Sequence, residues 1–244
     1  SAISTIDNTK SLMNKILKVK SLSIWIFLIP FIAVNACLIV STHYTELFKD
    51  GQAIYNQPFP ELFPYIDGGA SISRTARYFP TYLIFKPAMF LTSYLLIKYW
   101  LYNKEIVLSL GKNTKYIKKF VFFGISSAVC LILHSIFLGV KFDYDLYKLF
   151  RRVIMLSFVI FEIVAQTYLV LTFYSMKNYI NDFINPNILK IKIFLVTTLI
   201  VVALISIPII GLPGNKSIKH ALEWDYFLGV ISFYLLTFFM WKKK

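Results

Sequence analysis

Residues 220–244 read HALEWDYFLGVISFYLLTFFMWKKK, and this stretch decides the class of fold. Residues 226–241 form an apolar run that approaches the ~20 residues with which a helix crosses a bilayer. A histidine, a glutamate, a tryptophan and an aspartate precede the run, and three lysines follow it. The stretch therefore predicts a membrane-spanning helix with a polar mouth at one end and a basic tail at the other.

The rest of the chain has the same apolar character. Of its 244 residues, 57% are hydrophobic, 18% aromatic and only 16% charged, and the mean hydropathy is +0.65. A soluble domain of this length would need far more charge to cover its surface. The net charge of +14 does not indicate nucleic-acid binding, because the lysines stand in short loops beside apolar runs.

Apolar runs between charged breaks give six predicted spans in one all-α domain. We expect a polytopic helical bundle in which residues 1–22 are a basic N-terminal segment, 23–241 the transmembrane domain and 242–244 a tail. The predicted spans are about 23–41, 79–100, 120–140, 153–175, 193–211 and 226–241. Lysines precede the first run, as in a signal peptide, but the run continues past Cys37, so we expect an uncleaved span.

The basic residues predict the orientation. With a cytoplasmic N-terminus, the inner segments carry 16 of the 26 basic residues against three acids, and the outer segments carry nine against eight acids. The inner basic residues are Lys10, Lys15, Lys18, Lys20, Lys98, Lys104, Lys112, Lys115, Lys118, Lys119, Lys177, Lys190, Lys192 and Lys242 to Lys244. Because lysine and arginine concentrate in cytoplasmic loops, we expect both termini to be cytoplasmic. The membrane itself, whether plasma, inner or endomembrane, is left open.

The longest predicted outer segment is residues 42–78, with QPFPELFPYIDGGASISRTARYFP at its centre. Its prolines favour extended backbone, and Gly68 and Gly69 permit a tight turn. Its aromatic residues are typical of a loop folded onto the membrane interface. We therefore expect residues 42–78 to cap the outer end of the bundle.

Three ionisable side chains fall inside predicted spans. Lys86 lies about seven residues, or roughly 10 Å, from the outer end of its span. His134 lies about six residues from the outer end of its span, and Glu162 lies about ten residues into its span. Helical spacing places on one face Arg151, Met155, Phe158, Glu162 and Gln166. Intramembrane charges are costly and tend to face the bundle interior. We expect these groups to line one polar cavity, open on the outer side, with the HALEWD stretch at its rim.

Structural alternatives stay open for each group. Lys86 either snorkels to the outer interface or forms an ion pair with Glu162 that fixes the helix register. A neutral His134 bonded to a backbone carbonyl is favoured over a catalytic one. Cys37 and Cys130 are interpreted as packing residues. No CxxC pair or zinc spacing occurs, so we expect neither a metal site nor a cofactor.

No known catalytic signature occurs, since HExxH, GxSxG and P-loop patterns are missing from the sequence. The candidates for catalysis are His134, His220, Glu223 and Asp67. In that hypothesis a histidine acts as general base and a carboxylate orients it. Ser71 and Ser73 are near Asp67, and His220 is near Glu223, but proximity in a loop does not define the geometry of a nucleophile or a bound water.

Two stretches resemble the Frag1/DRAM/Sfk1 family of membrane proteins. PFPELFPYIDGGAS before the second span resembles the family's outer-loop motif, and HALEWDYFLGVISFYLLTF resembles its last span. The matching residues are Pro64, Tyr65, Ile66, Asp67, Gly69, His220, Glu223 and Trp224. The chain departs from the pattern at the start of the fourth span, which reads KLFRR where relatives carry a histidine and an acid. The resemblance implies six spans, a long first outer loop, and handling or sensing of lipid from the non-cytoplasmic leaflet.

Three functions follow from these patterns. The first is a protein that binds, senses or organises lipid. Its predicted lipid-binding residues are Lys86, Arg74, Arg77, Arg151, Arg152, Glu162, Gln166 and Trp224, with the arginines available for phosphate. The second is an acyl transferase or hydrolase acting on a lipid or lipid anchor. The third is a membrane scaffold subunit with a protein partner, whereas a transporter is disfavoured because no inverted repeat is evident. The expected partners are membrane lipids, and no nucleic acid.

Overall fold

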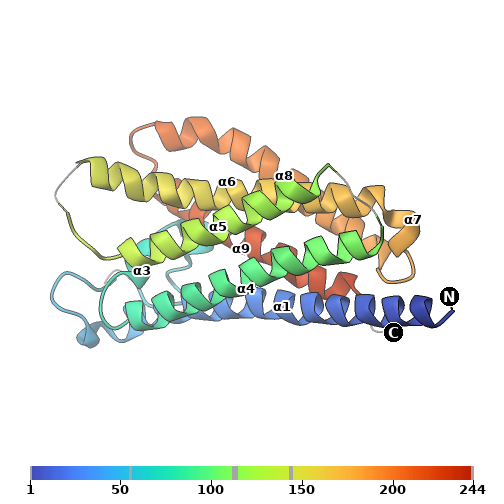
Figure 1. Ribbon diagram of the computed structural model, residues 1–244. Helices are drawn as coiled ribbons and strands as arrows, with labels where there is room; N and C mark the ends of the chain where they lie inside the picture. Colours follow the sequence, from blue (N-terminus) through green and yellow to red (C-terminus); the bar gives the residue numbers. More distant parts are fainter. Residues whose placement is uncertain (1, 55–56, 112–114, 143–144, 243–244) are drawn as a thin grey trace.

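The computed structural model describes residues 2–54, 57–111, 115–142 and 145–242, with side chains from residue 8 onward. Within these residues six long helices form an elongated bundle (Figure 1). Their bounds are α1 Ala2–His43, α4 Tyr82–Ser109, α5 Ile117–Phe137, α6 Asp145–Ser175, α8 Pro186–Gly211 and α9 Lys216–Met240. The predicted all-α fold is confirmed.

Short helical segments lie in the connections between the long helices. They are η1 Thr45–Leu47, α2 Pro64–Asp67, α3 Ile72–Ala76 and α7 Lys177–Ile180. Pro64 occupies the first turn of α2, where its missing N–H costs nothing. Gly68, at φ 61°, ends α2 in the left-handed conformation that glycine adopts most easily. The Ser71 hydroxyl accepts the backbone N–H of Arg74 and so begins α3.

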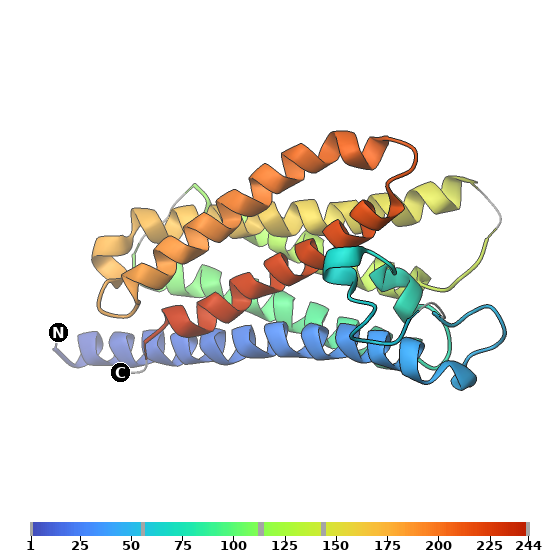
Figure 2. The ribbon, with the colours of Figure 1, turned by 180° about the vertical axis from the view of Figure 1, so that it is seen from behind.

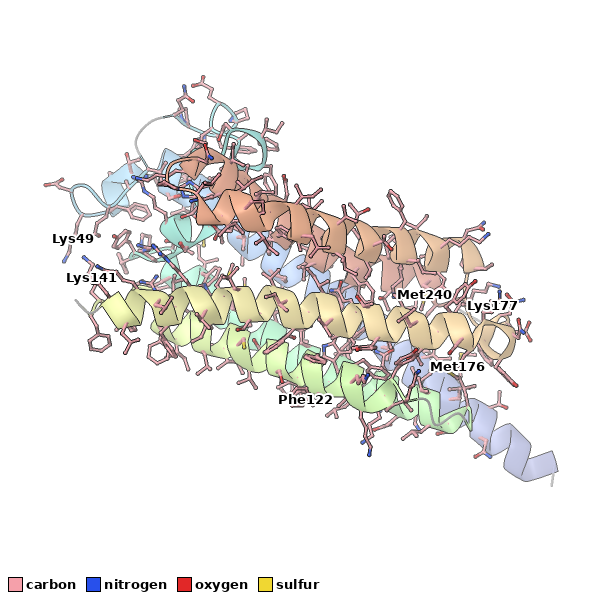
Figure 3. The ribbon with its side chains drawn as sticks, turned by 90° about the horizontal axis from the view of Figure 1, so that it is seen from above. Lys49, Phe122, Lys141, Met176, Lys177 and Met240 are labelled. Carbon is pink, nitrogen blue, oxygen red and sulfur yellow. The ribbon has the colours of Figure 1, made fainter. Side chains whose placement is uncertain are left out.

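Five of the long helices are long and apolar enough to cross a membrane, namely α1 from Asn8, α5, α6, α8 and α9. Their outward side chains are largely apolar, as at Phe122 (64% exposed), which projects from the bundle (Figure 3). Contiguous exposed apolar surface of this extent is unfavourable in water and suits a bilayer. The protein is therefore a multi-pass integral membrane protein.

The long helices pack in a defined order. α5 packs on α4 and α6, α1 packs on α4, and α9 packs on both α1 and α8. The two chain ends lie at the same end of the bundle (Figures 1 and 2). That end also holds Met176, Lys177 and Met240, and the opposite end holds Lys49 and Lys141 (Figure 3).

The helices extend beyond the spans predicted from sequence. Residues 8–22, predicted to form a separate basic segment, continue α1 without a break. α8 begins at Pro186 rather than near residue 193. Lys192 therefore lies inside α8, where it is fully buried, and its predicted place in a cytoplasmic loop is wrong. Residues 55–56 of the predicted cap, and the predicted inner residues Lys112, Lys243 and Lys244, fall outside the described residues.

Candidate functional site

A cavity of about 540 Å³ lies among α1, α4, α5, α6, α8 and α9. This volume is within the roughly 300–1,000 Å³ typical of ligand pockets. Much of its wall is apolar, including Met89, Leu131, Phe158, Leu204, Phe227 and Ile231. The sequence predicted a polar cavity, but the helix faces that meet here carry mainly aliphatic and aromatic side chains with a few polar groups between them. The cavity therefore suits a ligand that is mostly hydrocarbon.

The cavity lining is exposed on one side of the bundle. Leu156 and Ile160 of α6 line it, and so do Leu204, Ile207 and Ile210 of α8. All five are also exposed on the outside of the bundle, Leu204 by 62% and Ile207 by 64%. α8 has the lowest buried share of the five apolar helices, at 17%, and leans away from α6 toward its C-terminal end (Figure 1). The apolar lining is therefore accessible from the side of the bundle between α6 and α8.

Glu162 lies at the floor of the cavity and is fully buried. Its carboxylate accepts hydrogen bonds from Ser127 Oγ (2.6 Å), Gln166 Nε2 (3.0 Å) and Tyr234 OH (2.7 Å). These donors come from α5, α6 and α9, so the carboxylate ties three helices together. Gln166 also donates to the carbonyl of Val230 (3.2 Å). The predicted proximity of Glu162 and Gln166 on one helix face is confirmed.

Basic groups lie around His134. His134 lines the cavity wall, and the charges of Arg77 and Arg151 act on its imidazole and on each other. Arg77 is held in place by Ser73, whose carbonyl and hydroxyl each accept a guanidinium N–H at 3.1 Å. Glu223 is the nearby carboxylate: it interacts electrostatically with Arg77 and accepts backbone N–H groups at the start of α3. The cluster is therefore net positive.

Lys86 lies outside this site. Its Nζ donates to the carbonyl of Ile136 (3.4 Å) and lies over the Tyr82 ring, 5.7 Å from the ring centroid. Glu162 has other partners, so the predicted Lys86–Glu162 ion pair is wrong. The geometry matches the snorkelling alternative, in which an apolar stem lies along the helix and the ammonium reaches a polar boundary.

The predicted cap docks on the first turns of α9 (Figure 2). Trp224 Nε1 donates to the carbonyl of Ala70 (2.8 Å), and the fully buried Trp224 ring lies 4.9 Å from that of Tyr65. His220 Nδ1 lies 3.0 Å from the carbonyl of Gly68 and donates to it, since a carbonyl only accepts. Trp224 and His220 therefore hold the cap. The two stretches that carry the family resemblance contact each other.

Tyr65 adds a further tie between the cap and α1. Its hydroxyl donates to Asn35 Oδ1 at 3.2 Å. Burial raises the pKa of the Tyr65 hydroxyl above its ordinary value. The hydroxyl therefore stays protonated at neutral pH and remains a donor.

The catalytic candidates do not form a triad among the described residues. The Asp67 carboxylate accepts the backbone N–H groups of Phe63 and Gly69, each at 2.6 Å, and so stabilises its own turn rather than orienting a histidine. His220 binds a backbone carbonyl. Arg74 and Arg152 are exposed, away from the cavity wall. No cluster of three or more metal-ligating side chains occurs in the described part of the chain.

Lys192 is a fully buried lysine that the sequence analysis did not predict as a site residue. Its ammonium donates to Thr237 Oγ1 (2.7 Å) and lies 4.0 Å from the centroid of the Phe233 ring. The residue spacing indicates that Lys192 is buried, because Lys192, Val196 and Leu199 follow at steps of four and three on one helix face, and all three are buried. A lysine on the inward stripe of a helix is a candidate functional group.

No protein-family model, curated protein or solved structure matches this chain.

Proposed function

We propose that the protein binds a phospholipid of the non-cytoplasmic leaflet in the lateral cavity. The acyl chains lie against the apolar walls, and the phosphate binds the Arg77–Arg151 pair beside His134. One observation carries the proposal: a mostly apolar cavity, with lining residues of α6 and α8 exposed on the outside of the bundle, has in its wall His134, on whose imidazole the charges of Arg77 and Arg151 act. Guanidinium groups bind phosphate through paired hydrogen bonds.

The proposal includes six spans, with α4 as the sixth, and both termini in the cytoplasm. Its support is that the termini share one end of the bundle and that most basic residues precede or follow the spans at that end. The cavity and its arginines then belong to the non-cytoplasmic half. Membership of the Frag1/DRAM/Sfk1 family stays a prediction, and the catalytic and scaffold alternatives have no comparable observation in their support.

Lipid retention tests the proposal. The protein is extracted in mild detergent, and native mass spectrometry measures bound phospholipid. Arg151→Gln removes charge-assisted hydrogen bonds worth about 1.5–3 kcal/mol, so we expect retention to weaken roughly ten- to hundredfold. Arg152→Gln is the matched control, because Arg152 is adjacent but exposed.

A second pair of variants tests the apolar part of the site. Ala203 lines the cavity, whereas its neighbour Ile205 faces outward and is 60% exposed. Ala203→Phe fills the space that an acyl chain would occupy and is expected to abolish retention, while Ile205→Phe leaves it unchanged. Wild-type protein that retains no phospholipid, or equal retention by both members of each pair, contradicts the proposal.

A further inference from the structure

A second pocket lies between α1 and α4, which run side by side toward the end of the bundle that holds both termini (Figure 1). Its volume is about 380 Å³, and it shares no lining residue with the apolar cavity in the described part of the chain. The side chains that line it are polar or aromatic: Lys10, Ser11, Asn14, Lys15, Lys18, Tyr102 and Glu105. Three lysines face one glutamate, so the pocket is net positive.

The α1 side of the pocket is one helix face. Lys10, Asn14 and Lys18 follow at steps of four, and all three are exposed. Lys15 beside them is already engaged: its ammonium lies 3.7 Å from the Glu105 carboxylate and donates to the Ser109 hydroxyl (3.0 Å). The glutamate is therefore paired with Lys15 rather than with the other two lysines.

Lys10 and Lys18 have no counter-charge. Among the described residues no carboxylate lies within salt-bridge distance of either ammonium. The Lys18 ammonium lies over the Tyr102 ring, 5.2 Å from the ring centroid, which orients it toward α4 and into the pocket. Two unpaired ammonium groups beside the hydroxyl of Ser11 and the amide of Asn14 provide hydrogen-bond donors for an anion.

The pocket lies at the depth of lipid headgroups. Lys18 precedes the first predicted span, 23–41, by five residues, or roughly 7 Å, and the interfacial region lies just outside the hydrocarbon core. Trp25, seven residues beyond Lys18 on the same helix face, is 52% exposed. Leu101, one turn from Glu105 on the same face of α4, is 40% exposed. Exposed apolar side chains therefore continue from the pocket toward the bilayer, and a soluble anion would not use them.

We propose that this pocket binds the headgroup of an anionic phospholipid in the leaflet on the side of the membrane that holds the termini. Lys18 and Asn14 contact the phosphate, Lys10 adds positive charge above it, and the acyl chains lie along Trp25 and Leu101. Basic residues beside a membrane span attract anionic lipids. The pocket uses no residue of the lateral cavity, so this inference does not rest on the proposed function and either can fail alone.

Trp25 provides the reporter for a test. It is the exposed member of the four tryptophans, since Trp100, Trp224 and Trp241 are fully buried. The full-length protein is reconstituted in phosphatidylcholine vesicles that contain a minor share of phosphatidylglycerol with brominated acyl chains, which quench tryptophan at short range. We expect stronger quenching than with the same share of brominated phosphatidylcholine. Trp25→Phe is expected to remove this excess quenching.

Lysine variants test the headgroup contacts. Lys10→Gln/Lys18→Gln is expected to weaken the preference for phosphatidylglycerol roughly ten- to thirtyfold, and so to remove the excess quenching. Lys118→Gln/Lys119→Gln is the matched control, because it removes the same charge from exposed positions at the start of α5, and it is expected to retain the excess.

A second matched pair keeps all the lysines. Asn14→Asp places a negative charge inside the pocket and is expected to remove the excess quenching, whereas Asn8→Asp, at an exposed position of α1 outside the pocket lining, retains it. Ala203→Phe fills the lateral cavity and is also expected to retain the excess, which separates the two lipid sites.

Three results would overturn the inference. The first is equal quenching of the wild type by brominated phosphatidylglycerol and brominated phosphatidylcholine. The second is equal excess quenching in the pocket variants and their matched controls. The third is loss of the excess when inorganic phosphate is added at the concentration of the anionic lipid and constant ionic strength, because the pocket would then bind a soluble anion.

Discussion

Gly68 offers the sharpest test of how the cap is held on α9. Its φ is +61°, and a Cβ added there would lie 1.7 Å from the backbone oxygen of Ser217, 2.5 Å from its carbonyl carbon and 2.8 Å from its Cα. These atoms are backbone of the first turn of α9 and cannot move aside as a flexible side chain would. Gly68→Ala therefore forces the cap and α9 apart.

The magnitude follows from the contacts that are lost. A left-handed alanine costs about 1–2 kcal/mol. Separation also breaks the hydrogen bond from His220 to Gly68, worth about 0.5–1.5 kcal/mol, and leaves the buried N–H of Trp224 without its acceptor, at about 1–3 kcal/mol. The total is roughly 3–6 kcal/mol. At about 2–4 °C per kcal/mol for a chain of this size, we expect Tm to fall by roughly 6–24 °C.

Gly51→Ala is the matched control for this substitution. Gly51 also has a positive φ, +75°, but a Cβ added there would meet nothing within 4 Å. It carries the same backbone cost, about 1–2 kcal/mol, without the clash. Thermal unfolding of the purified protein, followed by tryptophan fluorescence, compares the two, and limited proteolysis of the cap detects local undocking. Equal Tm values together with equal proteolysis patterns for the two variants would refute the docking geometry.

Two further predictions concern the interior of the bundle. A Cβ at Gly124 would lie 2.3–2.5 Å from ring atoms of the fully buried Trp100. Overpacking of about 1–3 kcal/mol outweighs the gain in helix propensity of about 1 kcal/mol, so Gly124→Ala should lower Tm. Gly211→Ala is the control and should not lower Tm, because its added Cβ meets no atom within 4 Å. Because Lys86 and Glu162 do not contact each other, the stability changes of Lys86→Leu and Glu162→Leu should add in the double variant within about 0.5 kcal/mol; a clear coupling energy in thermal unfolding would contradict this.

The sequence predicts the helices and part of the cavity because apolar length and helical spacing are local properties. Met155, Phe158 and Glu162 recur at steps of three and four, and the structure places all three on the cavity wall. His134 lines the same wall. The predicted roles of these residues in binding or catalysis stay predictions, since spacing locates a side chain on a helix face but does not specify its ligand.

Other features depend on contacts that spacing does not reveal. The cap is held by backbone carbonyls of Gly68 and Ala70, and backbone acceptors occur at every position, so no residue type marks them. Lys192 was assigned to a loop because it follows Lys190 at the edge of an apolar run. The spacing of the buried residues of α8, to which Lys192 belongs, predicts the burial of this lysine better than the end of the apolar run does.

The stretch from residue 220 to the end of α9 contacts the cap, the cavity floor and Lys192. Trp224 holds the cap, and Tyr234 and Thr237 stand further along the same helix, at the cavity floor and beside Lys192. An α-helix is rigid along its axis, so a rotation of α9 moves these contacts together. The polar residues of HALEWD therefore have a structural role beyond marking the end of a span. They hold the cap on the same helix that carries Tyr234, the hydrogen-bond partner of Glu162.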